Sequence, residues 1–147
     1  MDIYSLIRRD HQRVRELFAK LEDDSGGGTE RAPLFALLKG ELTAHRAAEE
    51  ATFYAALSTL PEIGDRIEAA LEEHVDIDEL LQELSEVDVE DEAFARQLAE
   101  LREEVEHHVE EEEGEIFDEA RELLTDEQAE RIAQEMEAEK ARLAQAQ

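Results

Sequence analysis

Residues 45–54 read HRAAEEATFY, and residues 108–117 read HVEEEEGEIF. Each segment places a His four positions before a Glu, a spacing that puts both side chains on one face of an α-helix. The second segment lies 63 residues after the first, and the same shift carries His11 onto His74. The chain therefore contains two helical hairpins of one design, each with a lone His followed by a His-x-x-x-Glu pair.

The sequence around these motifs predicts four long helices. Apolar residues recur every three or four positions, and the intervening stretches are rich in Gly, Pro or acidic residues. The predicted helices cover residues 2–22, 29–60, 62–85 and 91–124. Between the first two, the stretch DDSGGG predicts a flexible loop. The second helix is expected to turn six apolar residues toward the core: Leu34, Leu37, Leu38, Leu42, Phe53 and Leu57.

These helices indicate an all-α fold. At 147 residues the chain fits a single domain. Long helices joined by short loops favour antiparallel neighbours, so we expect an up-down-up-down four-helix bundle over residues 1–124. Residues 125–128, TDEQ, have the pattern of a capping box. We expect residues 125–147 to form a short fifth helix that packs on the bundle and frays at its end.

The repeated His and Glu residues lie on the apolar stripes of their helices. A buried carboxylate is costly unless it is neutralised or bound to a cation, and helix bundles build metal sites from facing side chains. We therefore predict one metal centre inside the bundle. Its predicted ligands are His11, His45, Glu49, His74, His108 and Glu112. Two alternatives remain open: hydrogen-bonded core histidines, and a buried His–Glu network without metal.

Other polar residues near the motifs are assigned different places. His107 has Glu residues at helical spacing on both sides and is predicted to lie on the surface. Glu41 and Glu104 lie four residues before the paired His residues. They could accept hydrogen bonds from metal ligands, bind the metal themselves or face solvent. Tyr4 could flank the metal pocket and Tyr54 is expected to point away from it, but packing is the simpler role for both.

Charge and composition exclude several classes of function. The formal net charge of −27 would repel nucleic acids and anionic membrane surfaces, although a solvated surface explains this acidity as well. No apolar run approaches the ~20 residues of a membrane span, and no secretory signal is recognisable, so a cytoplasmic location is expected. The absence of Cys means that nitrogen and oxygen must bind any metal.

Four segments, in their order and spacing, resemble the hemerythrin-like HHE cation-binding family over residues 1–124: residues 10–11, 45–54, 72–74 and 107–113. The resemblance implies two non-haem iron ions joined by carboxylates and by an oxo or hydroxo group. The His residues of the first hairpin would bind one iron, those of the second hairpin the other, and Glu49 and Glu112 would bridge them. Oxygen-carrying members have a fifth His where this chain has Asp78. The centre should therefore be more open, unless Asp78 or solvent fills the gap.

Three functions agree with such a centre. The first hypothesis is a protein that binds dioxygen, nitric oxide or peroxide, as a carrier or sensor. The second is an enzyme that decomposes hydrogen peroxide as catalases do, which an open, ligand-poor site would favour. The third is iron handling. The sequence contains no motif that specifies an oligomeric state or a protein partner.

Overall fold

The computed structural model describes residues 1–23 and 30–145, and its elements over these residues are all helical. They are α1 (Ile3–Glu22), α2 (Arg31–Glu49), η3 (Glu50–Tyr54), α3 (Ala55–Ser58), α4 (Gly64–Ser85), α5 (Glu92–Glu111), η4 (Glu112–Ile116), α6 (Phe117–Leu123) and α7 (Asp126–Gln145). The two η elements are π-helical turns. The predicted all-α class is confirmed. Apart from Asp23, the predicted DDSGGG loop and the predicted helix start at Thr29 lie outside the described residues.

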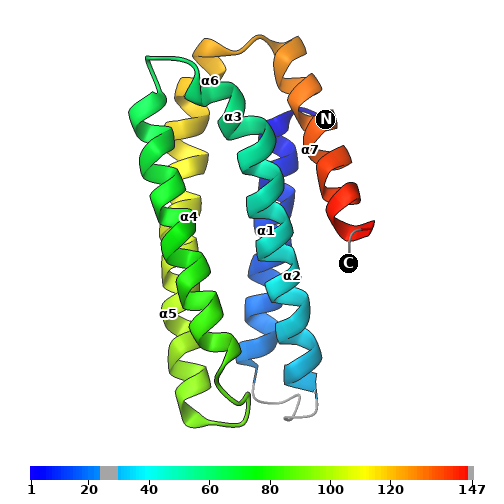
Figure 1. Cartoon of the computed structure of the whole chain (residues 1–147), viewed down its shortest axis with the longest axis vertical. Helices are drawn as coiled ribbons and strands as arrows, with labels where there is room; N and C mark the ends of the chain where they lie inside the picture. Colours follow the sequence, from blue (N-terminus) through cyan, green and yellow to red (C-terminus); the bar gives the residue numbers. More distant parts are fainter. Residues whose placement is uncertain (24–29, 146–147) are drawn as a thin grey trace.

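The long helices lie side by side along the long axis of the molecule (Figure 1). The segment from α2 to α3 runs opposite to α1, and the segment from α5 to α6 runs opposite to α4 (Figure 1). Contacts join α1 with α2 and α4 with α5, so each predicted hairpin is a pair of packed helices. The helix α7 packs against α1, α2 and η3 on the outside of this arrangement.

Two helices that the sequence predicts as continuous are interrupted by π turns. The first turn, η3, begins directly after Glu49, and the second, η4, begins at Glu112. A π turn contains one residue more than an α turn, and such turns are frequent at functional sites. The added residue rotates the following side chains by about 100° relative to a regular α-helix. This rotation changes which residues face the centre.

Capping interactions fix where several helices begin. The Asp2 carboxylate accepts a hydrogen bond from the Ser5 amide at the start of α1. Before α7, the Thr125 amide donates to Gln128 Oε1 at 2.8 Å and the Gln128 amide donates to Thr125 Oγ1 at 3.1 Å. This reciprocal pair is the predicted capping box. The helix that it opens has 20 residues, as many as α1, so the expectation of a short helix was wrong.

The buried apolar residues form two clusters. One contains Phe53, Phe117 and Met136 and joins the half of the bundle with η3 and α6 to α7. The other contains Phe18 and Leu81 in the opposite half. Leu37 belongs to neither, because it is 51% exposed, so its predicted inward position was wrong. A layer of buried polar side chains lies between the two clusters.

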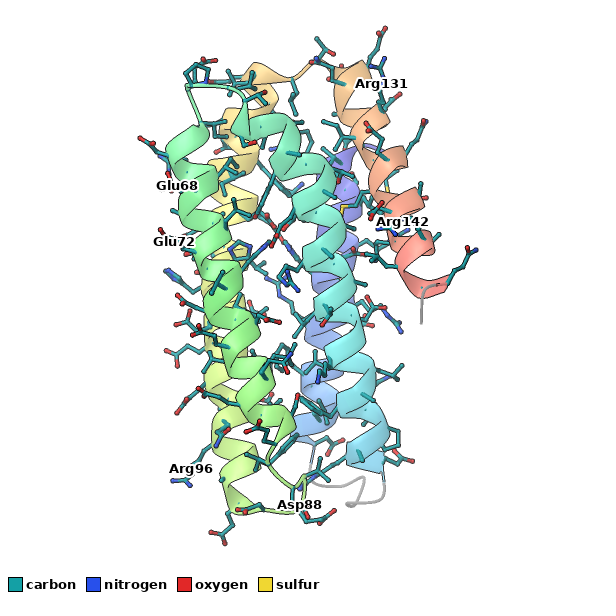
Figure 2. The ribbon with its side chains drawn as sticks, viewed as in Figure 1. Glu68, Glu72, Asp88, Arg96, Arg131 and Arg142 are labelled. Atoms are coloured by element: carbon teal, nitrogen blue, oxygen red, sulfur yellow. The ribbon has the colours of Figure 1, made fainter. Side chains whose placement is uncertain are left out.

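The outer faces of the helices carry charged residues. Glu68 and Glu72 project outward from α4, and Arg131 lies on the outer side of α7 (Figure 2). No helix within residues 1–23 and 30–145 is long and apolar enough to cross a membrane.

Candidate metal centre

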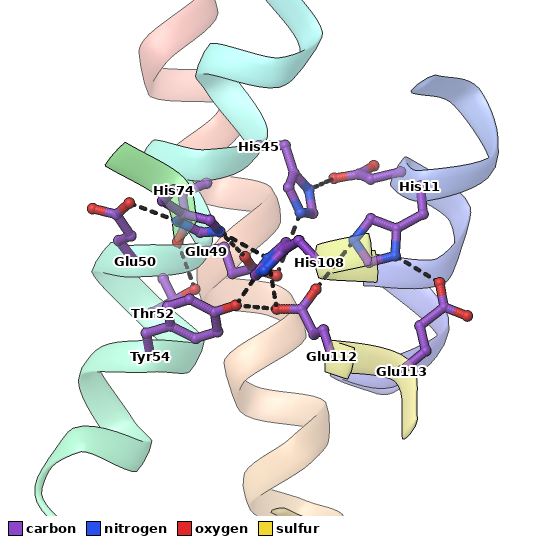
Figure 3. A network of polar contacts seen from close by, with 12 residues as sticks. His11, His45, Glu49, Glu50, Thr52, Tyr54, His74, His108, Glu112 and Glu113 are labelled. Carbon is purple, nitrogen blue, oxygen red and sulfur yellow. Dashed lines mark hydrogen bonds and ion pairs between the residues drawn. The ribbon is translucent and has the colours of Figure 1, made fainter. Parts of the chain in front are cut away.

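The structure brings all six predicted side chains into the polar layer between the two apolar clusters (Figure 3). Their exposed fractions lie between 0% and 8%. They come from four of the long helical segments: His11 from α1, His45 and Glu49 from α2, His74 from α4, and His108 and Glu112 from α5 and the start of η4. Helical periodicity alone thus placed these residues on the correct faces.

The donor atoms form two adjoining groups. The first consists of His11, His45, Glu49 and Glu112, and the second consists of Glu49, His74 and His108. Within each group, one nitrogen or carboxylate oxygen from each residue lies within 4.8 Å of the others. Glu49 belongs to both groups, so its carboxylate lies between two places where a cation could be held.

Four of the ligand-type atoms face their neighbours without a hydrogen bond. Glu49 Oε1 lies 3.2 Å from His74 Nε2, and Glu49 Oε2 lies 3.3 Å from His45 Nε2. Both oxygens, together with His45 Nε2 and Glu112 Oε1, are buried and lack a hydrogen-bond partner. Leaving such atoms unpaired is costly, and a bound cation would satisfy them. The donor set therefore fits a metal ion.

A further carboxylate contacts the Nδ1 atom of each imidazole, on the opposite side of the ring from Nε2. The Nδ1 atoms of His11, His45, His74 and His108 lie 2.6, 2.9, 2.7 and 2.7 Å from carboxylate oxygens. The partners, in the same order, are Glu113, Asp10, Glu50 and Glu73. An ionised carboxylate only accepts, so Nδ1 must donate its proton in each pair. This tautomer leaves the Nε2 lone pair free for a metal.

The four supporting carboxylates obey the same 63-residue shift as the ligands. Asp10 corresponds to Glu73, and each supports a His on the partner helix of its own hairpin. Glu50 corresponds to Glu113, and each supports the lone His of the other hairpin. Our sequence reasoning missed all four residues. The repeat contained the signal, because each directly precedes or follows a predicted ligand.

In the metal-free centre, the neighbouring His and carboxylate side chains stabilise one another's charged forms. Burial lowers the pKa of His45, but Glu49 and Asp10 outweigh it and raise this pKa to about 10. For His74, burial is likewise outweighed by the adjacent carboxylates of Glu49 and Glu50, and its pKa is about 9. Burial raises the pKa of Glu49, but the two imidazoles hold it well below its usual value. In the metal-free protein, protonated imidazoles thus supply the positive charge that a bound cation would supply.

Tyr54 lies inside the centre, so the expectation that it points away from it was wrong. Its hydroxyl donates a hydrogen bond to Glu112 Oε2 and lies 3.4 Å from His108 Nε2 (Figure 3). Its ring stacks on His74, with centroids 5.2 Å apart. Burial and the carboxylates of Glu112 and Glu49 raise the pKa of Tyr54 well above its usual value, so the phenol keeps its proton. The π turn η3 accounts for this orientation.

The remaining polar residues lie outside the two donor groups. The His107 side chain is 61% exposed, as predicted. Glu41 forms an ion pair with Arg13, 2.9 Å away, and Glu104 is exposed. Asp78 lies 4.0 Å from Arg46, with 38% of its side chain exposed. Asp78 belongs to neither donor group.

A small cavity adjoins the imidazoles. The four predicted His ligands line it together with apolar residues such as Val14 and Ile77, and Arg46 and Asp78 also contribute. Its volume is ≈ 40 Å³. In this measure one water occupies about 10–15 Å³, so the cavity admits only small molecules.

Comparisons with known proteins agree with this architecture. Residues 2–120 match the model of the hemerythrin HHE cation binding domain. A crystal structure of a hemerythrin HHE cation binding domain-containing protein from Mycobacterium kansasii superposes with a TM-score of 0.84. The two are 24% identical, and the match covers 97% of this chain and 86% of that one.

A curated relative, named DNA nickase, comes from Nostoc sp.. It is 30% identical over 145 residues, which are 99% of this chain but only 41% of the relative. The chain thus spans less than half the length of that protein. Because the family model covers most of the sequence, including all six predicted ligands, this chain belongs to the hemerythrin HHE cation-binding domain family.

Proposed function

We propose that this protein holds two iron ions and binds dioxygen or a related small molecule beside them. The metal-binding unit would be a hemerythrin-like up-down-up-down bundle over residues 1–124, with residues 125–147 as a helix packed on it. The observation that carries this proposal is the Glu49 carboxylate. Both of its oxygens are buried and without hydrogen bonds, and it belongs to both donor groups.

The donor chemistry supports a particular division of roles. His11 and His45 would hold one ion, while His74 and His108 would hold the other. Glu49 would span the two ions, and Glu112 Oε1 would complete the first set, since it lies 3.1 Å from His11 Nε2. Imidazole and carboxylate ligands suit iron, and four supported imidazoles with two carboxylates suit a pair of ions better than a single one.

Bound iron supplies reversible electron transfer to oxygen-containing ligands. The protein supplies selection and protection. Apolar side chains limit the cavity to small guests and keep bulk water away from the polar layer. The four carboxylates behind the imidazoles hold each Nδ1 proton and fix each ring in place. Dioxygen, nitric oxide and hydrogen peroxide all fit this space.

The position of Tyr54 favours peroxide decomposition as a second candidate function. In this reaction two hydrogen peroxide molecules give two waters and one dioxygen, so one peroxide is oxidised while the other is reduced. Proton transfer accompanies both halves. The Tyr54 hydroxyl holds a proton within the centre, next to Glu112. It could deliver that proton to a departing oxygen and recover it through the Glu112 carboxylate.

The name of the Nostoc relative suggests DNA cleavage, but the charge of this chain argues against it. A formal net charge of −27 opposes approach to the phosphate backbone. The charge belongs to this chain alone, whereas the relative contains further sequence beyond the matched part. We therefore propose no nucleic-acid substrate here.

Metal analysis followed by oxygen and peroxide assays tests the proposal. We expect about two irons per chain after anaerobic loading with ferrous iron. A stable, reversible absorption change on exposure to oxygen would indicate binding, whereas rapid oxygen release from peroxide would indicate the enzyme. Folded protein that retains no iron would refute the two-iron centre. Wild-type protein with one ion per chain, together with a Glu49 substitution that leaves the iron content unchanged, would refute it as well.

A further inference from the structure

The helix α7 reaches the metal centre through a buried ion pair. Lys140 Nζ lies 2.8 Å from Asp10 Oδ2, and Asp10 is only 3% exposed. The same oxygen lies 2.9 Å from His45 Nδ1. A continuous chain of charge-assisted hydrogen bonds thus joins a lysine near the end of α7 to one of the predicted ligands.

The four supporting carboxylates are not equally compensated by charge. Glu113 lies 3.5 Å from Arg8, and Glu50 lies 3.7 Å from Arg46. In contrast, Glu73 pairs only with His108 and His107 and forms no ion pair with a Lys or Arg among the described residues. The repeat relates Glu73 to Asp10, so the two hairpins differ at matching positions.

This difference has an electronic consequence for the imidazoles. A carboxylate oxygen that already accepts from an ammonium group is a weaker acceptor for a second donor. The Nδ1–H bond of His45 is therefore less polarised than it would be next to Asp10 alone, and its Nε2 donates less electron density to a metal. His108 has Glu73 behind it without such a cation, so its Nε2 is the stronger donor.

We propose that Lys140 is a positioning residue that weakens the hold of His45 on its ion and so makes the two metal positions inequivalent. The inference rests on the proposed two-iron centre. It assigns α7, which lies outside the family match at residues 2–120, a role in setting the properties of that centre. The effect travels through Asp10, because Lys140 contacts no predicted ligand directly in the ion pairs described.

Iron release to a strong chelator, followed over time, tests this assignment in the full-length protein. We expect wild type to release its two ions in two phases. Asp10→Asn should speed one phase by about 10–100-fold, because the support of His45 is weakened. Glu73→Gln should speed the other phase and so assign it to the His108 position.

The decisive variant is Lys140→Met. It should slow the Asp10-dependent phase by about threefold or more, because Asp10 then keeps only the longer ion pair with the exposed Arg9, 3.9 Å from its other oxygen. It should leave the other phase unchanged. Lys140→Arg should restore the wild-type rate. The control Arg142→Met removes a cation two residues away whose partner, Glu139, lies on the helix surface, and it should change neither phase.

Lys140→Met is expected to slow iron release and Asp10→Asn to speed it. This difference in direction distinguishes an electronic effect of Lys140 from a general loss of support for His45. If Lys140→Met speeds release as Asp10→Asn does, alters both phases alike or has no effect, the inference is overturned. A single release phase in wild type would overturn it as well. Wild-type protein that binds fewer than two ions would refute the proposed centre itself. Circular dichroism of each metal-free variant should show the wild-type helical content, and loss of helix in Lys140→Met alone would indicate a structural role.

Discussion

Replacing Glu49 by Ala should damage the metal centre more than replacing Glu112. Glu49 belongs to both donor groups, so its loss leaves one group with three donors and the other with two. Loss of Glu112 affects only the first group. We therefore expect Glu49→Ala to retain less than one iron per chain, and Glu112→Ala to retain one ion more firmly than the other.

The loss of metal should also appear as a loss of stability. A ligand bound at 100 times its Kd stabilises a folded protein by about 2.7 kcal/mol, so failure to bind one such ion removes about that amount. For a chain of this size the change corresponds to roughly 5–10 °C in Tm. We expect this difference between iron-loaded wild type and Glu49→Ala, measured by calorimetry at equal iron concentration. The metal-free proteins should differ less.

Glu110→Ala provides the matched control, because it removes an exposed Glu from the same acidic run without touching the centre. Its iron content and Tm should equal those of wild type. If Glu49→Ala keeps two irons and the stabilisation that metal gives to wild type, Glu49 does not span two ions. In that case residues other than Glu49 would have to hold both ions.

Three further perturbations test separate parts of the structure. Tyr54→Phe should fold normally and keep its iron, but its rate of peroxide turnover should fall about tenfold or more, because Glu112 loses its proton donor. Oxygen-electrode rates check this, and unchanged rates would exclude a proton-transfer role for Tyr54. Metal affinity should rise with pH up to about pH 10 and weaken as pH falls, because a metal ion must displace protons from His45 and His74, whose metal-free pKa values are about 10 and 9. Metal titrations at several pH values check this, and an affinity that does not change with pH would place these groups outside the site. Thr125→Ala should lower the free energy of unfolding by about 1 kcal/mol through loss of the capping box, and equal urea midpoints would contradict the cap.

The repeat has a meaning beyond the ligands themselves. The shift that relates Glu49 to Glu112 also relates the carboxylates behind the imidazoles, so the duplication includes the support of the centre. The same shift carries Tyr54 onto Phe117, which has no hydroxyl, so the two halves differ at this position. Glu112 accepts a hydrogen bond from Tyr54, whereas both Glu49 oxygens have none. The two halves thus share their predicted ligands and supporting carboxylates and differ in the hydroxyl of Tyr54.

Residue spacing was sufficient to predict the helices and the faces that carry His11, His45, Glu49, His74, His108 and Glu112. Helical periodicity is local, so a run of apolar residues determines which side chains share a face before any packing is known. The family, too, followed from motif order. Spacing failed at Leu37, where the expected apolar stripe extends beyond the buried surface, and at Tyr54, where a π turn changes the helical phase.

The sequence by itself determined that two similar hairpins each present two imidazoles and one carboxylate on an apolar face. Only the tertiary structure decided which carboxylate stands behind which imidazole, that Tyr54 reaches Glu112, and that Lys140 reaches Asp10 across 130 residues of sequence. Periodicity describes a single helix, whereas these contacts depend on how separate helices rotate and pack. That arrangement results from burial of the whole core, which no short stretch of sequence specifies.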